Sequence, residues 1–163
     1  MRKAVVLAAI FLLVPLAAHA QKNEIFLGYS FMRMEAAPSN VTISGWEGSY
    51  TRLFSPYFGL TGDTSGHYGT ISNARLNFHS YYGGAQVRLP LRFSPFAHAL
   101  IGDTRLSFQG FVTNKFSVAV GGGVDYRAWD SFYVRLVQVD YLTGLHTQTT
   151  PDYRISTGLI LRF

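Results

Sequence analysis

Several serine and histidine residues have spacings that raise the question of acyl-transfer chemistry. Ser65 lies two positions before His67, and Ser80 follows His79 directly. A serine nucleophile needs a histidine base, and that base needs a third group, usually a carboxylate, to orient it. No carboxylate is obviously placed for either imidazole, and His146 is not followed by serine at the second position. The pattern therefore favours ordinary polar histidines and predicts no catalytic residue.

The other motifs that could bind a cofactor are incomplete. The three glycines at 121–123 could form a phosphate-binding loop, but no helical pattern follows them, as such a loop requires. No cluster of His, Asp or Glu has the spacing of a metal site. The formal net charge of +5 is small and scattered, which argues against a nucleic-acid partner. We therefore expect no cofactor, no metal and no nucleic acid.

Charged residues of both signs recur at alternating positions in segments that we predict, for reasons given below, to be the strands of a closed barrel. In a narrow closed interior such charges must pair or be hydrated, because each unpaired charge costs several kcal/mol. We interpret them as a salt-bridged plug with some water, and a narrow conducting pore is the competing interpretation. The predicted interior network consists of Glu47, Asp63, Arg88, Asp125, Arg127, Arg135, Asp140 and Arg154.

The elements that position these charges are alternating segments long enough to cross a bilayer. A tilted transmembrane strand needs about ten residues, and the chain has no helical period after its first segment. Low charge (14%), high aromatic content (15%) and 16 glycines suit this interpretation. We predict an all-β protein, an eight-stranded antiparallel up-and-down transmembrane β-barrel. The predicted strands are 24–34, 44–54, 57–67, 78–89, 94–104, 115–127, 132–142 and 153–163.

The predicted connections alternate in length. Those near Ser55, Leu91 and Trp129 are short, and the others are long and polar. Outer-membrane barrels have short periplasmic turns and longer external loops, so this order predicts both termini in the periplasm. The long connections are expected at 35–43, 68–77, 105–114 and 143–152.

Two strands depart from simple alternation. In the fifth we place His98 inside, because a polar ring in lipid is costly and the neighbouring alanines can face lipid. In the seventh, strict alternation from an inward Arg135 sends Gln138 and Asp140 into lipid. One extra residue near Leu136 and Val137 removes that conflict, so we predict a β-bulge there.

The N-terminal segment has the features of a secretory signal peptide. Two basic residues precede a short apolar run, and small residues stand at the positions that signal peptidase reads. We predict a signal peptide at 1–20, with cleavage between Ala20 and Gln21, and a barrel domain at 21–163. The alternative, an N-terminal membrane helix, is disfavoured because the apolar run is shorter than the ~20 residues a span needs.

The last strand ends in an alternating pattern that closes on an aromatic residue. This pattern, the signal peptide, the strand count and the sorted connections resemble the small eight-stranded outer-membrane barrels. Representative members of this family are the transmembrane domain of outer membrane protein A and its shorter relative, outer membrane protein X. The resemblance covers Lys22 to Phe163 and implies a terminal signal read by the outer-membrane assembly machinery. The residues of that signal are Tyr153, Ile155, Leu159, Leu161 and Phe163.

The resemblance is specific for fold and location and weak for activity. It implies an integral protein of a Gram-negative cell outer membrane, with outer-membrane lipids, lipopolysaccharide and the assembly machinery as partners, and a monomeric state. The expected role is structural, adhesive or surface-protective and is carried by the external loops. The alternatives are a narrow porin-like channel and a lipid A-modifying barrel enzyme.

Overall fold

The computed structural model describes residues 23–36, 39–71, 74–108, 111–144 and 152–163. The predicted signal peptide, its cleavage site and His146 lie outside this set. No helix among the described residues is long and apolar enough to cross a membrane. The strands are β1 (Asn23–Ala36), β2 (Ser39–Leu53), β3 (Phe58–Ile71), β4 (Ala74–Arg88), β5 (Phe93–Phe108), β6 (Phe111–Arg127), β7 (Phe132–Gly144) and β8 (Asp152–Arg162).

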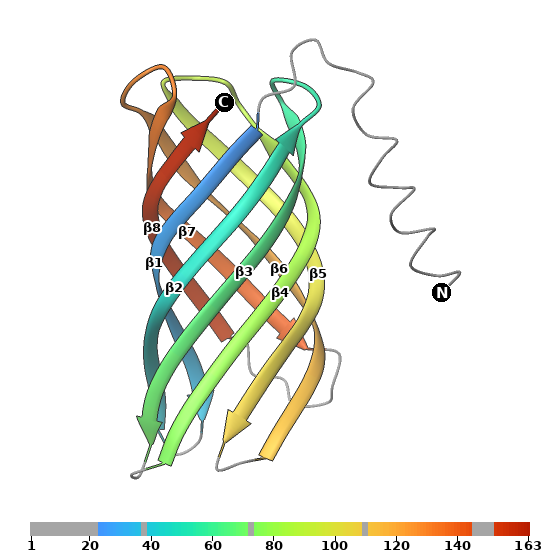
Figure 1. Cartoon of the computed structure of the whole chain (residues 1–163), viewed down its shortest axis with the longest axis vertical. Helices are drawn as coiled ribbons and strands as arrows, with labels where there is room; N and C mark the ends of the chain where they lie inside the picture. Colours follow the sequence, from blue (N-terminus) through green and yellow to red (C-terminus); the bar gives the residue numbers. More distant parts are fainter. Residues whose placement is uncertain (1–22, 37–38, 72–73, 109–110, 145–151) are drawn as a thin grey trace, which may run out of the picture.

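Each strand pairs antiparallel with the next, and β1 pairs with β8 to close the sheet (Figure 1). The first and last described residues are joined at this seam, where Asn23 N donates to Phe163 O at 2.7 Å and Phe163 N donates to Asn23 O at 2.9 Å. A closed sheet leaves no edge with unpaired backbone groups. The predicted eight-stranded up-and-down barrel is thus confirmed.

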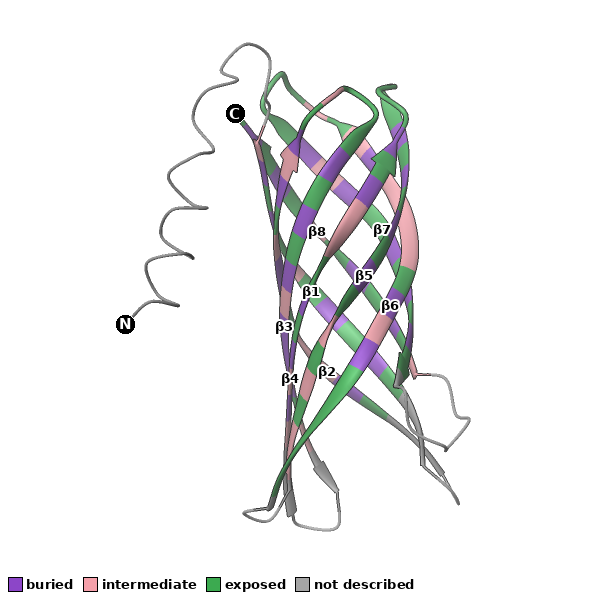
Figure 2. Cartoon of the chain, turned by 90° about the vertical axis from the view of Figure 1, so that its right-hand side faces the viewer, coloured by how far each residue is buried: buried purple, intermediate pink, exposed green. Residues whose placement is uncertain are grey.

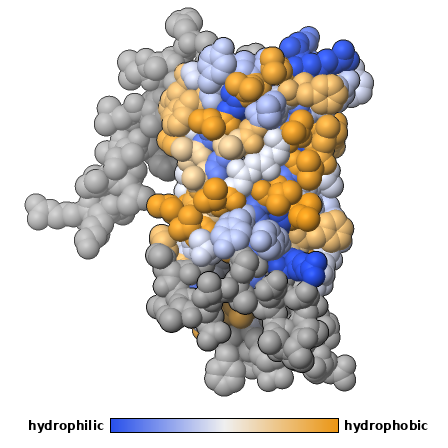
Figure 3. Space-filling model, turned by 180° about the vertical axis from the view of Figure 1, so that it is seen from behind, coloured by the Kyte–Doolittle hydropathy of each residue, from blue (hydrophilic) through white to orange (hydrophobic). Residues whose placement is uncertain are grey.

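Side chains alternate between a buried inner face and an exposed outer face along each strand (Figure 2). Aliphatic and aromatic residues occupy the outer face, and β-branched and aromatic residues also favour extended backbone. Leu27 and Leu159 are 65% and 64% exposed, whereas Ser30 and Arg154 are fully buried. Figure 3 shows the apolar side chains over one outer face. The barrel is therefore inverted relative to a water-soluble protein, with oily residues outside and polar residues inside.

The three short connections lie at the same end as both described termini, which we call the turn end (Figure 1). In the first, Ser55 Oγ accepts hydrogen bonds from Tyr57 N at 3.2 Å and Phe58 N at 3.0 Å. The short connections predicted near Ser55, Leu91 and Trp129 are confirmed. We call the opposite end of the barrel the hairpin end.

The long connections at the hairpin end are mostly strand, which corrects the prediction. The β1–β2 ladder continues to the pair Ala36 and Ser39, and the β5–β6 ladder continues to Phe108 and Phe111. Polar composition predicts loops there, but two polar strands can still satisfy each other's backbone groups beyond a membrane. The connection predicted at 143–152 falls mostly outside the described residues.

The predicted bulge in β7 is confirmed. The β7–β8 register shifts between Arg135 and Gln138, and Asp125 of β6 pairs with Arg135. Leu136 and Val137 are both exposed on the outer face, while Gln138 and Asp140 are buried. The extra residue therefore returns the polar side chains that follow it to the interior.

Candidate functional site: the buried charge network

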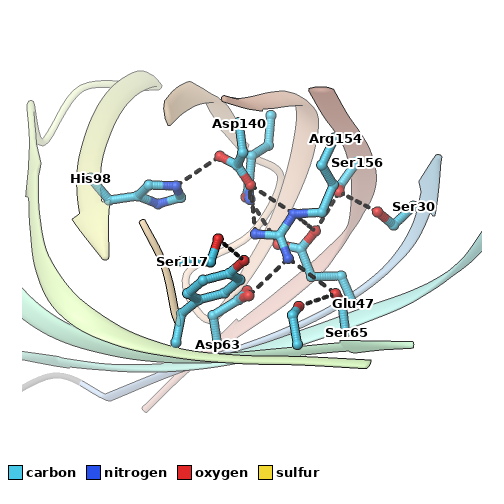
Figure 4. A network of polar contacts seen from close by, with 12 residues as sticks. Ser30, Glu47, Asp63, Ser65, His98, Ser117, Asp140, Arg154 and Ser156 are labelled. Atoms are coloured by element: carbon cyan, nitrogen blue, oxygen red, sulfur yellow. Dashed lines mark hydrogen bonds and ion pairs between the residues drawn. The ribbon is translucent and has the colours of Figure 1, made fainter. Parts of the chain in front are cut away.

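Arg154 of β8 is the centre of the interior network (Figure 4). Its guanidinium donates from Nε at 2.9 Å and Nη2 at 2.6 Å to Asp140 Oδ2, and from Nη1 at 2.9 Å to Asp63 Oδ1. Glu47 Oε2 lies 3.3 Å from Nε, and Ser65 Oγ accepts from Nη1 at 3.2 Å. Side chains from three strands, β2, β3 and β7, thus converge on one fully buried cation of β8.

Gln138 joins this centre to a second ion pair. Its Nε2 donates to Glu47 Oε1 and to Asp140 Oδ2, both at 2.7 Å, and its Oε1 accepts from Arg135 Nη1 at 2.6 Å. Arg135 also forms a fork with Asp125, at 2.8 and 3.2 Å. A two-point contact of this kind fixes orientation as well as charge.

Neutral donors and one histidine complete the shell of the carboxylates. His98 Nε2 lies 2.8 Å from Asp140 Oδ1, and Ser156 Oγ donates to Glu47. Ser156 Oγ also lies 3.0 Å from Ser30 Oγ. Three carboxylates surround Arg154, so these hydrogen bonds offset negative charge that one guanidinium does not neutralise.

A separate cluster closes the turn end. Glu24 of β1 forms ion pairs with Arg88 of β4 and Arg162 of β8, and Arg162 lies 3.8 Å from the centre of the Tyr133 ring. Glu24 and Arg162 do not belong to the network predicted from the sequence. Strand alternation could have found both, because each is next to a lipid-facing residue and therefore points inward.

Apolar layers lie on both sides of the network. Toward the turn end, Phe26, Tyr133 and Ile160 form a buried cluster. The Arg135 guanidinium lies between two rings, 4.3 Å from Phe26 and 4.2 Å from Phe96. The cation–π contacts with these two rings stabilise the Arg135 guanidinium where it lies next to the apolar cluster.

The layer toward the hairpin end is a feature that the sequence does not predict. On β1, β5 and β7 the next inward residue beyond Ser30, His98 and Asp140 is apolar and buried. These residues belong to a second cluster, the apolar cap, which consists of Met32, Ile43, Phe78, Tyr82, Leu100, Ala119 and Leu142. The cap fills the narrow interior with side chains and separates the charged network from the hairpin end.

Seven of the eight predicted network residues are buried, and Arg127 is not. Glu47, Asp63, Asp125, Arg135, Asp140 and Arg154 meet in the central network, and Arg88 belongs to the cluster at the turn end. The Arg127 side chain is 52% exposed and pairs at 2.9 Å with Asp130. The correction has a simple reason: Arg127 is the last residue of β6, where the chain leaves the barrel for a turn.

The predicted assembly signal lies on the outer face of β8. Tyr153, Ile155, Leu159, Leu161 and Phe163 are all exposed there, in line along the strand. Their orientation leaves them accessible to lipid or to another protein. Recognition of these residues by an assembly machinery stays a prediction.

The serine and histidine candidates have other partners. His67 Nε2 lies 3.0 Å from Ser30 Oγ, while Ser65 Oγ lies 2.6 Å from Ser80 Oγ. His79 packs edge-on against the Tyr68 ring, with a centroid distance of 5.7 Å. No group of three or more potential metal ligands occurs in the described part of the chain. The described serines and histidines therefore belong to a polar interior held by hydrogen bonds and ion pairs, and the pairings Ser65–His67 and Ser80–His79 suggested by the sequence are not formed.

No protein-family model matches the sequence, and no curated protein matches it. Solved structures do match the fold. Neisserial surface protein A is 12% identical, with a TM-score of 0.73, over 86% of this chain and 97% of that one. Ail, the attachment invasion locus protein of Yersinia pestis, in complex with the heparin analogue sucrose octasulfate, is 17% identical, with a TM-score of 0.67, over 89% and 100%.

A third match is the N-terminal β-barrel domain of Pseudomonas aeruginosa OprF. It is 14% identical, with a TM-score of 0.64, and covers 88% of this chain and 100% of that domain. At these identities the likeness concerns the fold alone. The chain therefore has the fold of the small eight-stranded outer-membrane β-barrels, as the resemblance to outer membrane proteins A and X implied.

Proposed function

We propose that the protein is an integral barrel of a Gram-negative outer membrane, with its turn end and both termini in the periplasm. The observation that carries this proposal is a closed sheet with an apolar outer face and buried charges. Exposed aromatic residues gather near both ends, as in the interfacial belts of membrane proteins. Outer-membrane lipids, lipopolysaccharide and the assembly machinery are the proposed partners of the monomer.

The location is tested by fractionation and by electrophoresis. We expect the protein to sediment with outer membranes and to migrate differently before and after boiling, because a closed barrel resists detergent until it is heated. Recovery of the processed chain as a detergent-free monomer in the periplasm contradicts the proposal. Protease added to intact cells should leave a tag inserted after Gln21 uncut and cut a tag inserted at 145–151.

We infer that the barrel is a closed scaffold rather than a channel. Support comes from three successive barriers: the Glu24 cluster, the network around Arg154 and the apolar cap. An ion crossing this interior has to break buried ion pairs and then pass an apolar layer. Purified protein in a planar bilayer should give no steady single-channel steps, and steady steps contradict the closed scaffold.

A lipid A-modifying enzyme is the less favoured alternative. The buried serines and His67 face the barrel interior, where a lipid headgroup has no access. His79 is near the surface, but its contact is an aromatic ring. A lipid A mass profile with and without the gene tests this directly. An unchanged number of acyl chains is expected, and a change in that number favours the enzyme.

The remaining role lies at the hairpin end, which we propose faces the outside. Exposed residues there include Val112, Thr113, Asn114 and Lys115 of β6. Ail, which shares the fold, has a name that refers to attachment and a structure with a heparin analogue. A structural, adhesive or surface-protective role of the hairpin ends is therefore proposed. Intact cells carrying the protein should bind immobilised sulfated glycan better than cells with 112–115 replaced by serine, and equal binding counts against adhesion.

A further inference from the structure

A cleft at the turn end has a composition unlike the rest of that rim. It lies between the turn after β4 and the turn after β6, and its volume is about 460 Å³. The two turns are joined by a hydrogen bond from Arg127 N to Arg92 O, at 2.9 Å. We call it the turn cleft. Its lining residues are Pro90, Leu91, Arg92, Arg127, Ala128, Trp129 and Asp130.

Two guanidinium groups line this cleft, and neither is part of the buried network. Arg92 Nη2 donates to Tyr126 Oη at 3.0 Å, and its guanidinium carbon lies 5.6 Å from the centre of the Tyr126 ring. Within the described residues Arg92 forms no ion pair with a carboxylate. Arg127 Nη2 pairs with Asp130 Oδ1 at 2.9 Å, but both side chains are largely exposed to solvent. An exposed pair of this kind is weak and can exchange partners.

Large apolar side chains surround the same two cations. Trp129 is 73% exposed, and Leu91 is 59% exposed. Phe93 and Phe132, which begin the adjoining strands, are 57% and 53% exposed. Apolar side chains next to arginines are typical of the boundary between hydrocarbon and headgroups. There an arginine can place its aliphatic stem against hydrocarbon and its guanidinium among the headgroups.

Other arginines lie at the turn end, but Arg88 and Arg162 are buried against Glu24, and Arg52 belongs to β2 rather than to a turn. The remaining tight turn, between β2 and β3, has Phe54, Ser55, Pro56 and Tyr57, with no basic residue. Both turn regions offer aromatic contacts, but only the turn cleft adds two guanidinium groups. A general requirement for interfacial aromatics therefore does not account for the arginines.

We propose that the turn cleft binds the phosphate group of an anionic phospholipid from the adjacent leaflet. Arg92 and Arg127 contact the phosphate, Trp129 and Leu91 lie at the level of the glycerol backbone, and the acyl chains run along Phe93 and Phe132. Two guanidiniums outweigh the single carboxylate of Asp130, so net charge favours an anionic lipid over a zwitterionic one. This inference rests on the proposed membrane location.

Trp129 supplies the readout. The chain has only two tryptophans, so Trp46→Phe leaves Trp129 as the sole tryptophan, and excitation at a wavelength that tyrosine does not absorb isolates its fluorescence. This variant is reconstituted in vesicles that contain brominated phosphatidylglycerol or brominated phosphatidylcholine, and quenching gives their relative binding constant at Trp129. We expect phosphatidylglycerol to be favoured by roughly tenfold at low salt. Each arginine contributes about fivefold, and the carboxylate of Asp130 reduces the product of the two contributions. The preference should fall as salt is raised.

Matched variants separate the cleft from general electrostatics. Arg92→Gln with Arg127→Gln should bring the relative binding constant close to one. Arg105→Gln, which removes an exposed cation toward the hairpin end of β5, should leave it unchanged. Asp130→Asn should raise it, because Arg127 then loses its internal carboxylate. Equal quenching by both lipids in the parent, or a preference that survives in the double variant, overturns the proposal.

Two further measurements keep the result interpretable. Heat-dependent migration of each sample reports barrel formation, so a failure of the membrane proposal is distinguished from a failure of the cleft alone. Inorganic phosphate added at constant ionic strength should not displace brominated phosphatidylglycerol, because the lipid also binds through its chains. Displacement at millimolar phosphate overturns the assignment to a lipid.

Discussion

At the scale of single residues, the interior depends most on Arg154. It is fully buried and contacts Glu47, Asp63 and Asp140. Arg154→Met keeps much of the volume and leaves three carboxylates without their cation. We expect a loss of about 3 to 5 kcal/mol in the free energy of unfolding, since breaking a buried ion pair on one side strands the other charge. Urea titration in lipid vesicles, followed by electrophoretic migration, measures this loss.

Two variants interpret that loss. Arg154→Lys keeps the charge but not the planar fork, so an intermediate loss is expected. Arg105→Gln removes an exposed charge and should change stability by less than about 0.5 kcal/mol. A loss for Arg154→Met no larger than for Arg105→Gln shows that the buried network contributes little to stability.

Glycines give a second prediction at this scale. A Cβ at Gly158 would lie 2.4 Å from Gly28 Cα and 2.3 Å from Leu27 O, because β1 and β8 approach closely at the barrel seam. A Cβ at Gly62 meets nothing within 4 Å. Gly158→Ala should therefore cost about 1 to 3 kcal/mol of unfolding free energy, as overpacking does. Gly62→Ala should be neutral or stabilising by the same urea titration, and equal losses refute the distinction.

The residue patterns show what the sequence can and cannot predict. Alternation alone assigns the side of the sheet, and it correctly predicts that Asp63, Asp125 and Arg154 point into the barrel, whereas Asp140 does so only because of the bulge in β7. Alternation does not assign height along the barrel, which depends on the register between strands. The apolar cap escapes prediction for this reason: Leu100 and Leu142 are inward, but only register shows that they meet in one layer.

At the scale of elements, the bulge in β7 decides which side chains of that strand face inward. Deleting Leu136 removes the extra residue between Arg135 and Gln138. The residues on one side of the deletion then exchange the inner face of the sheet for the outer face. Either Arg135 or the pair Gln138 and Asp140 then faces hydrocarbon. We expect no heat-dependent migration and accumulation of unassembled chain, whereas Leu136→Ala, which keeps the register, should fold. A folded deletion variant contradicts the role given to the bulge.

The ends of the strands are the least predictable elements. Polar composition predicts loops at 35–43 and 105–114, but much of both ranges belongs to paired strands. The change from apolar to polar residues indicates where the strands leave the membrane. The strands themselves continue as long as their backbone groups pair. Arg127 is a second example. Alternation predicts that its side chain points into the barrel, but Arg127 is the last residue of β6 and its side chain is exposed.

At the scale of the whole molecule, closure joins the first and last described residues at one seam. Asn23 and Phe163 exchange backbone hydrogen bonds there, while the Phe163 side chain is 59% exposed. The backbone of this residue therefore closes the barrel, and its side chain is available for the predicted assembly signal. These two roles can be separated by a substitution that changes only the side chain.

Phe163→Ser should lower the amount of barrel assembled in cells without preventing folding of the purified chain. The backbone bonds to Asn23 remain, and an exposed aromatic makes little difference to a finished barrel beyond its contact with lipid. Cell fractionation with heat-dependent migration measures assembly, and refolding into vesicles measures the intrinsic reaction. Phe132→Ser is the matched control, because Phe132 is 53% exposed at the same end but lies outside the predicted signal. Equal effects of the two substitutions in cells indicate loss of an interfacial aromatic rather than loss of a signal.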